Sequence, residues 1–404
     1  MAGIVVVGAG QAAISCVARL RKQGFAGPIT VIGAEEVPPY QRPPLSKAYL
    51  KGEMALERIL LRPPHWYADN EVEMRVATRA EAIDPAARRV TAGGEAIPYD
   101  DLVLATGATP RRLPAEIGGD LGHVHVVRRL ADVDALAGDM RPGARLVVVG
   151  GGYIGLEAAA VAAELGLEVT LLESAPRILG RVAAPETADF FRTLHAAHGV
   201  TIREGVALAR LEGTGDVSGV RLEDGSLLPA DLVIVGIGVT PEVALAREAG
   251  AVIDNGIAVD GHGRTSLPHV WAAGDCASFP WRGARIRLES VQNAIDQAEC
   301  VADNLAGIET AYDPSPWFWS DQYDVKLQIA GLNAGYDRVA VRPGTSAGSA
   351  SHWYYRGDDL IAVDAMNDPR AYMVGKRLIE AGRSPAAREV ADPGADLKAL
   401  LAAG

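Results

Sequence analysis

Residues 4–20 read IVVVGAGQAAISCVARL, and residues 146–165 read LVVVGGGYIGLEAAAVAAEL. In both stretches an apolar run leads into a glycine turn and then into an alanine-rich segment. A second apolar run follows each of them, at 29–32 in the first copy and at 169–172 in the second. Strand, turn, helix and strand in this order form a βαβ unit with parallel strands. The repeat therefore predicts an α/β fold with two Rossmann-like units.

The end of the chain has a different pattern. Short runs of alternating apolar and polar residues follow Pro314 and Pro316, which is typical of antiparallel strands. Asp368 and Pro369 suit the N-cap and first position of a helix that we expect to reach Leu378. A chain of 404 residues also exceeds what one hydrophobic core usually supports. We expect a C-terminal α+β domain with an antiparallel sheet.

The composition disfavours some classes of partner and indicates where the protein is located. The net charge of −12 disfavours binding to nucleic acid or to an anionic membrane. No signal peptide is recognisable, and no apolar run reaches the roughly 20 residues of a spanning helix, so a cytoplasmic location is expected. Cys16, Cys276 and Cys300 have no CxxC spacing, so we expect reduced structural thiols and no metal site.

Both glycine turns match the dinucleotide fingerprint, in which bare backbone approaches a pyrophosphate at a helix N-terminus. The fingerprint residues are Gly8, Gly10 and Ala13 in the first turn, and Gly150, Gly152 and Gly155 in the second. A tight turn without a ligand is the alternative for the first. The strand before and the helix after each turn favour the nucleotide.

An acidic residue after the second strand of such a unit binds the adenosine ribose. Glu173 has this position in the second copy and would repel a 2′-phosphate, which favours NADH over NADPH, although Arg177 could soften the preference. Gly33 stands there in the first copy. Glu35 is the favoured substitute, with Glu36 or an ordinary surface carboxylate as alternatives.

Two further motifs follow apolar strands. Residues 265–275 read TSLPHVWAAGD and end in Gly274 and Asp275, where the carboxylate can hold a hydroxyl of a nucleotide. Ala105, Thr106 and Gly107 follow the apolar run at 102–104. Each motif is weak by itself, because such dipeptides are common in turns.

Taken in this order, the motifs resemble those of the two-dinucleotide flavoprotein reductases, which have a glutathione-reductase-like fold. The resemblance covers nearly the whole chain, and it implies FAD on the first unit and NADH on the second. It also implies a split FAD-binding domain at 1–108 and 236–315, an NADH-binding domain at 109–235 and a C-terminal domain at 316–404.

The absence of certain cysteines and the presence of three segments indicate the branch of this superfamily. No cysteine lies between Cys16 and Cys276, which excludes the dithiol chemistry of the disulfide reductases. The segments RPPLSK at 42–47, ESVQNA at 289–294 and PWFWSDQ at 316–322 resemble the ferredoxin and rubredoxin reductases of bacterial oxygenases, such as the putidaredoxin reductase group.

The resemblance assigns roles to individual residues. Lys47 would lie near flavin N5 and stabilise the reduced flavin, and Glu157 would pair with it; a solvated lysine and a helix-surface glutamate are the alternatives. Trp319, or else Trp317, would lie at the flavin edge that faces the redox partner, unless it is a core aromatic. Further nucleotide contacts are expected from Arg42, Tyr153, Ile154, Gly238, Val291 and Gln292.

The implied activity is transfer of a hydride from NADH to FAD, followed by single-electron transfer to an acidic 2Fe-2S ferredoxin that serves an oxygenase or cytochrome monooxygenase. A rubredoxin reductase, a reductase of small organic radicals and, from another class, an NADH-sensing flavoprotein of the apoptosis-inducing type are alternatives. Arg285 and Arg287 alternate in strand phase and are candidates to dock the ferredoxin near Trp319, unless they are ordinary surface arginines. A monomer or weak dimer is expected.

Overall fold

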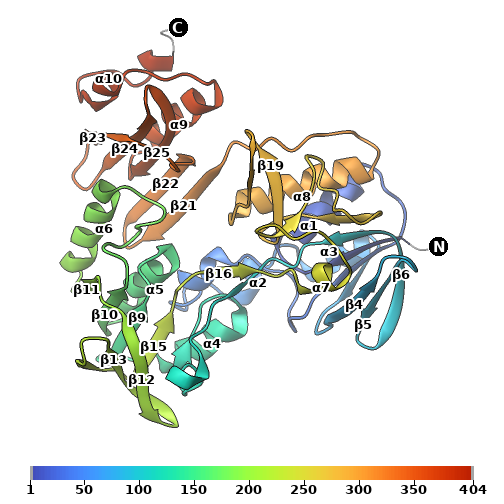
Figure 1. Cartoon of the computed structure of the whole chain (residues 1–404), viewed down its shortest axis with the longest axis horizontal. Helices are drawn as coiled ribbons and strands as arrows, with labels where there is room; N and C mark the ends of the chain where they lie inside the picture. Colours follow the sequence, from blue (N-terminus) through green and yellow to red (C-terminus); the bar gives the residue numbers. More distant parts are fainter. Residues whose placement is uncertain (1–2, 402–404) are drawn as a thin grey trace. The chain divides into compact units, whose positions relative to one another are not determined.

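The structure is a computed structural model that describes residues 3–401. The chain divides into two compact units (Figure 1). The first unit comprises the chain up to Arg42, Ala55–Thr109 and Val239–Pro314; the second comprises Pro43–Met54, Pro110–Gly238 and the chain from Ser315 onward. The chain crosses between the units through two strands, β7 (Ala108–Pro110) and β16 (Val239–Pro241), which pair with each other.

The first unit is built on a parallel sheet. Its strands lie in the order β3 (Val72–Arg75), β2 (Ile29–Ile32), β1 (Gly3–Val7), the second half of β6 (Glu95–Leu104) and β18 (Val270–Ala272). The first half of β6 continues into an antiparallel meander with β5 (Arg89–Ala92) and β4 (Ala80–Asp84). The smaller elements are α2 (Leu56–Ile59), α3 (Pro64–Asp69), α7 (Ala244–Glu248), β17 (Ile257–Ala258), β19 (Ala277–Trp281) and β20 (Ala284–Ile286).

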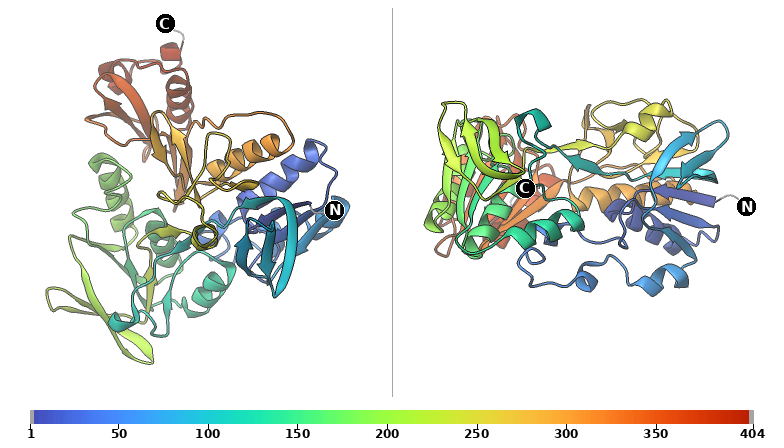
Figure 2. Two further views of the ribbon diagram at one scale, coloured as in Figure 1. Left: turned by 45° about the vertical axis from the view of Figure 1, so that its right-hand side comes forward. Right: turned by 90° about the horizontal axis from the view of Figure 1, so that it is seen from below.

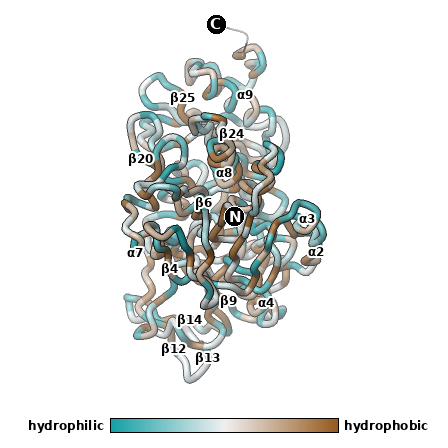
Figure 3. Tube along the Cα trace, turned by 90° about the vertical axis from the view of Figure 1, so that its right-hand side faces the viewer, coloured by the Kyte–Doolittle hydropathy of each residue, from teal (hydrophilic) through white to brown (hydrophobic). Residues whose placement is uncertain are grey.

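The apolar run of β1 is buried on both faces of this sheet. Ile4 and Val6 enter one hydrophobic core, and Val5 and Val7 enter another. Since alternate side chains of a strand point to opposite faces, an unbroken apolar run is the pattern expected of a strand that is covered on both sides. Figure 3 traces the hydropathy along the chain, with apolar residues in brown.

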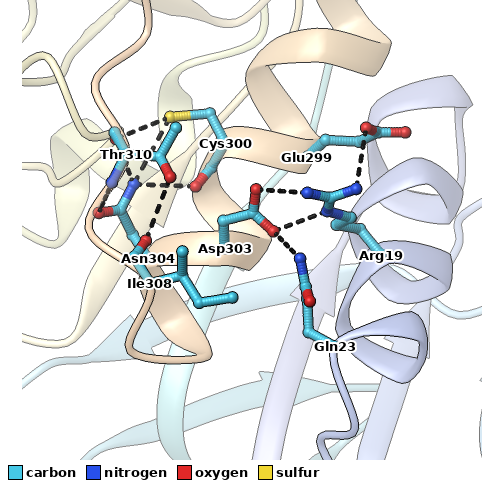
Figure 4. Close-up of polar contacts among 8 residues, drawn as sticks. All are labelled: Arg19, Gln23, Glu299, Cys300, Asp303, Asn304, Ile308 and Thr310. Atoms are coloured by element: carbon cyan, nitrogen blue, oxygen red, sulfur yellow. Dashed lines mark hydrogen bonds and ion pairs between the residues drawn. The ribbon is translucent and has the colours of Figure 1, made fainter.

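Helices α1 (Gln11–Lys22) and α8 (Val291–Leu305) lie side by side in the first unit (Figure 2). Small residues of both helices share one core, which allows a close approach. Arg19 of α1 binds Asp303 of α8 through two hydrogen bonds of 2.6 and 2.8 Å, and Gln23 adds a third of 2.6 Å (Figure 4). The pKa of Asp303 is lowered, chiefly by the hydrogen bonds from Arg19. The two helices are thus joined by packing and by charge.

The second unit contains another parallel sheet. Its strands lie in the order β11 (Thr201–Glu204), β10 (Glu168–Glu173), β9 (Arg145–Val149), β15 (Leu232–Val235) and β8 (Val124–His125). Its helices are α4 (Leu130–Asp139), α5 (Tyr153–Glu164) and α6 (Pro185–Ala197), and an antiparallel sheet is formed by β12 (Leu208–Thr214), β13 (Asp216–Leu222) and β14 (Leu227–Pro229).

The C-terminal part of the second unit is a five-stranded antiparallel sheet. The strand order is β21 (Trp317–Gln322), β22 (Val325–Gly331), β25 (Asp359–Met366), β24 (Ala350–Arg356) and β23 (Arg338–Pro343). Helix α9 (Pro369–Glu380) packs on this sheet, and α10 (Ala387–Ala391) follows. The expected cap of α9 is present, since Asp368 accepts a 3.0 Å hydrogen bond from the amide of Ala371. The helix extends two residues beyond the expected Leu378.

The predicted fold class is confirmed: two parallel Rossmann-like sheets are followed by an antiparallel C-terminal domain. The helices that the structure describes are too short or too polar to cross a membrane.

Candidate functional site

The first glycine turn connects β1 to α1 and leaves the start of the helix open. Gly8 has φ +113°, and a Cβ there would lie 2.1 Å from the carbonyl oxygen of Ala105. Gly10 is the N-cap of α1 and offers no side-chain hydrogen bond to it. Apart from its neighbours in the chain, no described residue has an atom within 4 Å of a Cβ built at Gly10. The first amides of α1 thus face a space that suits an anionic group.

Other predicted residues lie at the same edge of the first sheet. Parallel strands β1, β6 and β18 are in register, so the segments after Leu104 and Ala272 begin at the same end as the glycine turn. The amide of Gly274 donates 2.9 Å to Oε1 of Gln297, whereas the buried Nε2 of Gln297 has no partner among the described residues. This unpaired donor is an observation in favour of a polar ligand.

Glu35 and Arg42 form a charged group in the loop after β2. Arg42 Nη2 lies 2.6 Å from Glu35 Oε1, and the hydroxyl of Tyr40 donates to Glu35 Oε2 over 2.5 Å. Burial by itself lowers the pKa of Arg42, but the nearby charges of Tyr40, Glu35 and Asp275 raise it overall. The fold therefore brings Asp275 close to this loop. The carboxylate of Glu35 is therefore already paired with the guanidinium of Arg42.

Three more predicted residues of the first unit have defined places. The hydroxyl of Thr106 donates a 2.6 Å hydrogen bond to the carbonyl of Glu242, so its hydrogen is used within the protein. Val291 and Gln292 form the first turn of α8, which Ser290 caps by accepting a 3.1 Å hydrogen bond from the amide of Asn293.

The cysteines are unsuited to dithiol chemistry. All three are buried and free of disulfides. Burial raises the pKa of Cys16 to about 12 and that of Cys300 to about 11, and it also raises the pKa of Cys276. A thiol needs to ionise to act as a nucleophile. The burial and the raised pKa values of these thiols fit the predicted structural role.

The second glycine turn connects β9 to α5. Gly150 has φ +109°, and a Cβ there would lie 2.4 Å from the carbonyl oxygen of Gly236. A Cβ at Gly155 would lie 2.1 Å from the carbonyl oxygen of Gly150, so the third glycine lets the helix pack on the turn. Gly152, the N-cap, has open space and makes no side-chain cap.

The carboxylate of Glu173 lies directly over this turn. Its Oε2 accepts 2.8 Å from the amide of Gly151, and its Oε1 accepts 2.7 Å from the amide of Ala175. Two backbone donors hold the carboxylate beside the open helix end, as ribose recognition requires. Ile154 is 46% exposed at the same helix start. Gly238, with φ +99°, follows β15 at the neighbouring strand end.

Lys47 and Glu157 are brought together by the segment Pro43–Met54, which belongs to the second unit. Lys47 Nζ lies 2.6 Å from Glu157 Oε2, and Ser46 donates 2.6 Å to the same oxygen. Ser320 of β21 donates 2.7 Å to Oε1. Glu157 is only 3% exposed. This buried carboxylate therefore has three donors, one of them a cation, which is the arrangement a buried charge requires.

The hydrogen bonds continue from Ser320 into the interior. Gln322 Nε2 donates 3.2 Å to the hydroxyl of Ser320, and Gln322 Oε1 lies 2.8 Å from Nε2 of His195 on α6. Tyr323 bonds the other ring nitrogen of His195 over 3.1 Å. Burial lowers the pKa of His195 to about 4, so the imidazole is neutral near pH 7. A single network thus extends from Lys47 to α6.

Trp319 does not join this network. Alternate residues of β21 face opposite sides, and Ser320 faces Glu157 while Phe318 packs on Tyr153 at 4.9 Å between ring centroids. Trp319 lies on the other face, 5.6 Å from the ring centroid of Trp317.

Arg285 and Arg287 lie at or just after β20, but their side chains are partly committed. Arg285 Nη1 donates to the carbonyls of Val259 and Ser278 over 3.0 and 2.7 Å, and its side chain keeps about a third of its surface exposed. Arg287 is 11% exposed and lies 2.7 Å from Glu289.

Sequence reasoning missed the residues that hold Glu157. Ser46 and Ser320 lie inside the segments RPPLSK and PWFWSDQ, but no role was expected of them. Their partner is more than 100 residues away along the chain. Only their position beside Lys47 and within the tryptophan motif could have drawn attention to them.

The fold and both glycine turns are those of a pyridine-nucleotide-dependent reductase. The family model described as pyridine nucleotide-disulphide oxidoreductase matches residues 2–298, and the reductase C-terminal model matches residues 317–401. The chain belongs to the pyridine nucleotide-disulphide oxidoreductase family.

Individual relatives narrow the class. A ferredoxin–NAD(P)(+) reductase of Sphingomonas sp. is 47% identical over 94% of this chain and 92% of its own. The ferredoxin reductase subunit of a 5,5'-dehydrodivanillate O-demethylase of Sphingobium sp. is 42% identical over 99% and 98%. The reductase in a covalent putidaredoxin reductase–putidaredoxin complex is 40% identical, with a TM-score of 0.95 over 99% of this chain and 98% of that one. The predicted resemblance to the ferredoxin reductases is confirmed.

Proposed function

We propose that this protein is a flavin-dependent NAD(P)H:ferredoxin oxidoreductase that supplies electrons to an oxygenase or a cytochrome monooxygenase. The observation that carries this proposal is the pair of open glycine turns in a chain whose described cysteines are all buried. Two nucleotides can bind, and a dithiol cannot relay electrons between them. The two similar ferredoxin reductases described above support the same activity.

We assign FAD to the first turn and the nicotinamide nucleotide to the second. The open N-terminus of α1 and the unpaired Nε2 of Gln297 support the first assignment. The carboxylate of Glu173 supports the second. Residues 1–108 and 236–315 would form the FAD-binding domain, and residues 109–235 would form the NADH-binding domain. Residues 316–404 would form the C-terminal domain. The segment Pro43–Met54 is an exception, since its contacts group it with the second unit.

NADH is the proposed nucleotide rather than NADPH. Glu173 is held by two amides and presents a negative charge where a 2′-phosphate would lie. A Glu173→Ala variant is expected to lose about tenfold or more in kcat/KM for NADH, the order expected for one charged hydrogen bond, and to lose much less for NADPH. The control is Glu223→Ala, which removes an exposed carboxylate of the same unit.

When bound, FAD would accept a hydride and release electrons singly. The residues of this chain would orient the reacting groups and set the charge near the flavin ring. Lys47 is directed by the stiff Pro43-Pro44 segment and anchored by Glu157, so its ammonium is held in one place. We propose that this ammonium stabilises negative charge on the flavin ring. No general acid or base is needed for a hydride transfer between stacked rings.

The ferredoxin is proposed to dock beside Arg285, with Arg287 and Trp319 as further candidate contacts. Arg287 is covered and lies 2.7 Å from Glu289, whereas Arg285 is more exposed and lies 3.7 Å from Asp254, so Arg285 would supply more of the positive charge. Arg285→Glu should raise the KM for an acidic ferredoxin severalfold, and the effect should weaken at high salt. Arg210→Glu, on an exposed strand, is the matched control.

The test of the whole proposal is anaerobic stopped flow of the purified protein. NADH should bleach the flavin much faster than NADPH, and an added 2Fe-2S ferredoxin should then be reduced over many turnovers. Flavin reduction without electron transfer to any ferredoxin would overturn the partner assignment. Transfer to a rubredoxin alone would replace it with a rubredoxin reductase.

A further inference from the structure

A group of potential metal ligands lies in the second unit among residues to which no role has been given. Nδ1 of His123 and Nε2 of His125 lie 2.7 and 2.6 Å from the same oxygen, Oδ2 of Asp139. One ligand atom from each of the three residues lies within 4.8 Å of the other two. Two imidazoles and a carboxylate thus converge on one point.

The local backbone aims both imidazoles in one direction. His125 is the last residue of β8 and His123 directly precedes this strand, and both imidazoles lie within 2.7 Å of the same Asp139 oxygen. His123 has φ +60°, a conformation that residues with a Cβ rarely adopt. Asp139 is the last residue of α4 and approaches from another element. The site is therefore assembled by two elements, with one strained residue held in place.

A second carboxylate lies near His123. Nε2 of His123 lies 3.7 Å from Oδ2 of Asp216, while its Nδ1 faces Asp139. Gly122 makes room for Asp216, because a Cβ at Gly122 would lie 2.1 Å from the Oδ1 atom of that residue. At 3.7 Å this contact is an ion pair and not a hydrogen bond, and a carboxylate near the far nitrogen of a ligating histidine raises the basicity of the ring in known metal sites.

The distances suit a small transition metal ion. Zinc binds histidine nitrogen and carboxylate oxygen at about 2.0–2.2 Å in a tetrahedral arrangement, which places neighbouring ligand atoms about 3.3 Å apart. The nitrogens of His123 and His125, now at 2.7 and 2.6 Å, would each need to move about 0.6–0.7 Å away from the Asp139 oxygen. The side chains are 39%, 12% and 21% exposed, so an ion can enter and a water can complete the set. Imidazole ligands favour zinc, nickel or copper over magnesium or calcium.

We propose that His123, His125 and Asp139 form a binding site for a divalent transition metal ion of the zinc class, with Asp216 as a nearby outer carboxylate. The ion joins β8 to the end of α4. The site is independent of the nucleotide chemistry proposed above. Cysteine spacing gave no sign of it, because its ligands are imidazole and carboxylate.

The test uses the untagged, flavin-loaded protein after treatment with a chelator and dialysis. Zinc binding is measured by equilibrium dialysis with metal analysis, and the thermal midpoint is recorded with and without zinc. We expect one saturable ion per chain and a rise in the midpoint. His125→Asn and His123→Asn should each weaken binding at least tenfold, and Asp216→Asn should weaken it severalfold. His65→Asn, an exposed histidine of the first unit, is the control.

Flavin reduction by NADH serves as the folding check for every variant and should be unchanged. Absence of saturable binding by the intact protein would overturn the proposal. Binding that both His123→Asn and His125→Asn leave intact would overturn it as well, because the ion would then lie elsewhere.

Discussion

The two βαβ units begin with nearly the same sequence but differ where a nucleotide ribose would lie. In the second unit Gly151 has no side chain, so Glu173 can fold its carboxylate over the turn and accept from the Gly151 amide. In the first unit the corresponding residues are Ala9 and Gly33, and a Cβ at Gly33 would lie 2.6 Å from the Cβ of Ala9. The methyl group of Ala9 thus leaves no room for a side chain at position 33 unless one of the two residues shifts.

The helices of the two units differ in the same way. Ser15 of α1 stands where α5 has Glu157, and its hydroxyl accepts a 3.2 Å hydrogen bond from Gln11 of its own helix. Glu157 instead collects donors from two distant segments. The shared backbone therefore provides two nucleotide cradles, and a few side chains give each its task.

The largest expected effect concerns which turn binds which nucleotide. Gly8→Ala would place a methyl group against the carbonyl of Ala105, and Gly150→Ala would place one against Gly236. We expect Gly8→Ala to be purified without flavin, and Gly150→Ala to stay yellow but to react poorly with NADH. Flavin content and NADH reduction rate measure both. Flavin lost from Gly150→Ala and kept by Gly8→Ala would reverse the assignment.

Gly24→Ala is the control for this pair. Gly24 also has a positive φ, of +83°, but nothing lies within 4 Å of a Cβ there. It should lose only about 1 kcal/mol of unfolding free energy, from backbone strain alone, and keep its flavin.

The next largest effect concerns the contacts of Glu157, the carboxylate of α5 that has no counterpart in α1. Lys47→Ala should slow flavin reduction by NADH on the order of 10- to 100-fold, because a charge-assisted contact is lost. Ser320→Ala removes one neutral donor from Glu157 and should slow it only severalfold. Lys51→Ala is the matched control, since Lys51 pairs with Glu164 of the same helix at a more exposed position. Equal effects of Lys47→Ala and Lys51→Ala would contradict the role of Lys47.

The next expected effect is a difference between the two units in how much stability they lose in acid. His195 is buried in the second unit with a pKa of about 4, against an ordinary value of about 6.5. The unfolded chain therefore takes up a proton first, and about 3 kcal/mol of stability present above pH 6.5 is lost as the pH falls toward 4. Burial lowers the pKa of His352 in the same direction, while burial raises that of Asp364 to about 6 and opposes the trend.

The measurement is urea unfolding from pH 7 to pH 4, with probes in each unit. The described histidines of the first unit are not buried, so its stability should change less. A His195→Gln variant should show a shallower loss in the second unit. An unchanged slope in that variant would exclude His195 as the cause.

The smallest effect tests the methyl group that separates the two turns. Gly33→Ala should lower the unfolding free energy by about 1–3 kcal/mol, since its Cβ would overlap that of Ala9. Ala9→Gly should restore most of that loss in the double variant. Additive losses in the double-mutant cycle would show that the two positions do not interact.

Local patterns in the sequence were sufficient for much of this molecule. The apolar runs predicted β1, β2, β9 and β10, because a strand covered on both faces needs apolar side chains at every position. The glycines predicted the turns, since only glycine adopts the positive φ and tolerates the close carbonyl at these points. Absence of paired cysteines excluded dithiol chemistry without any coordinates.

Contacts between distant segments were decided only by the tertiary structure. The resemblance suggested that Lys47 and Glu157 meet, but the serines on either side of Glu157, 111 and 163 residues away from it, carry no local signal of that role. The face on which Trp319 lies and the burial of Arg287 likewise depend on how strands and loops pack. Backbone conformation is set by neighbours in the chain, whereas the partners of a polar side chain are set by whatever packing brings within about 3 Å of it.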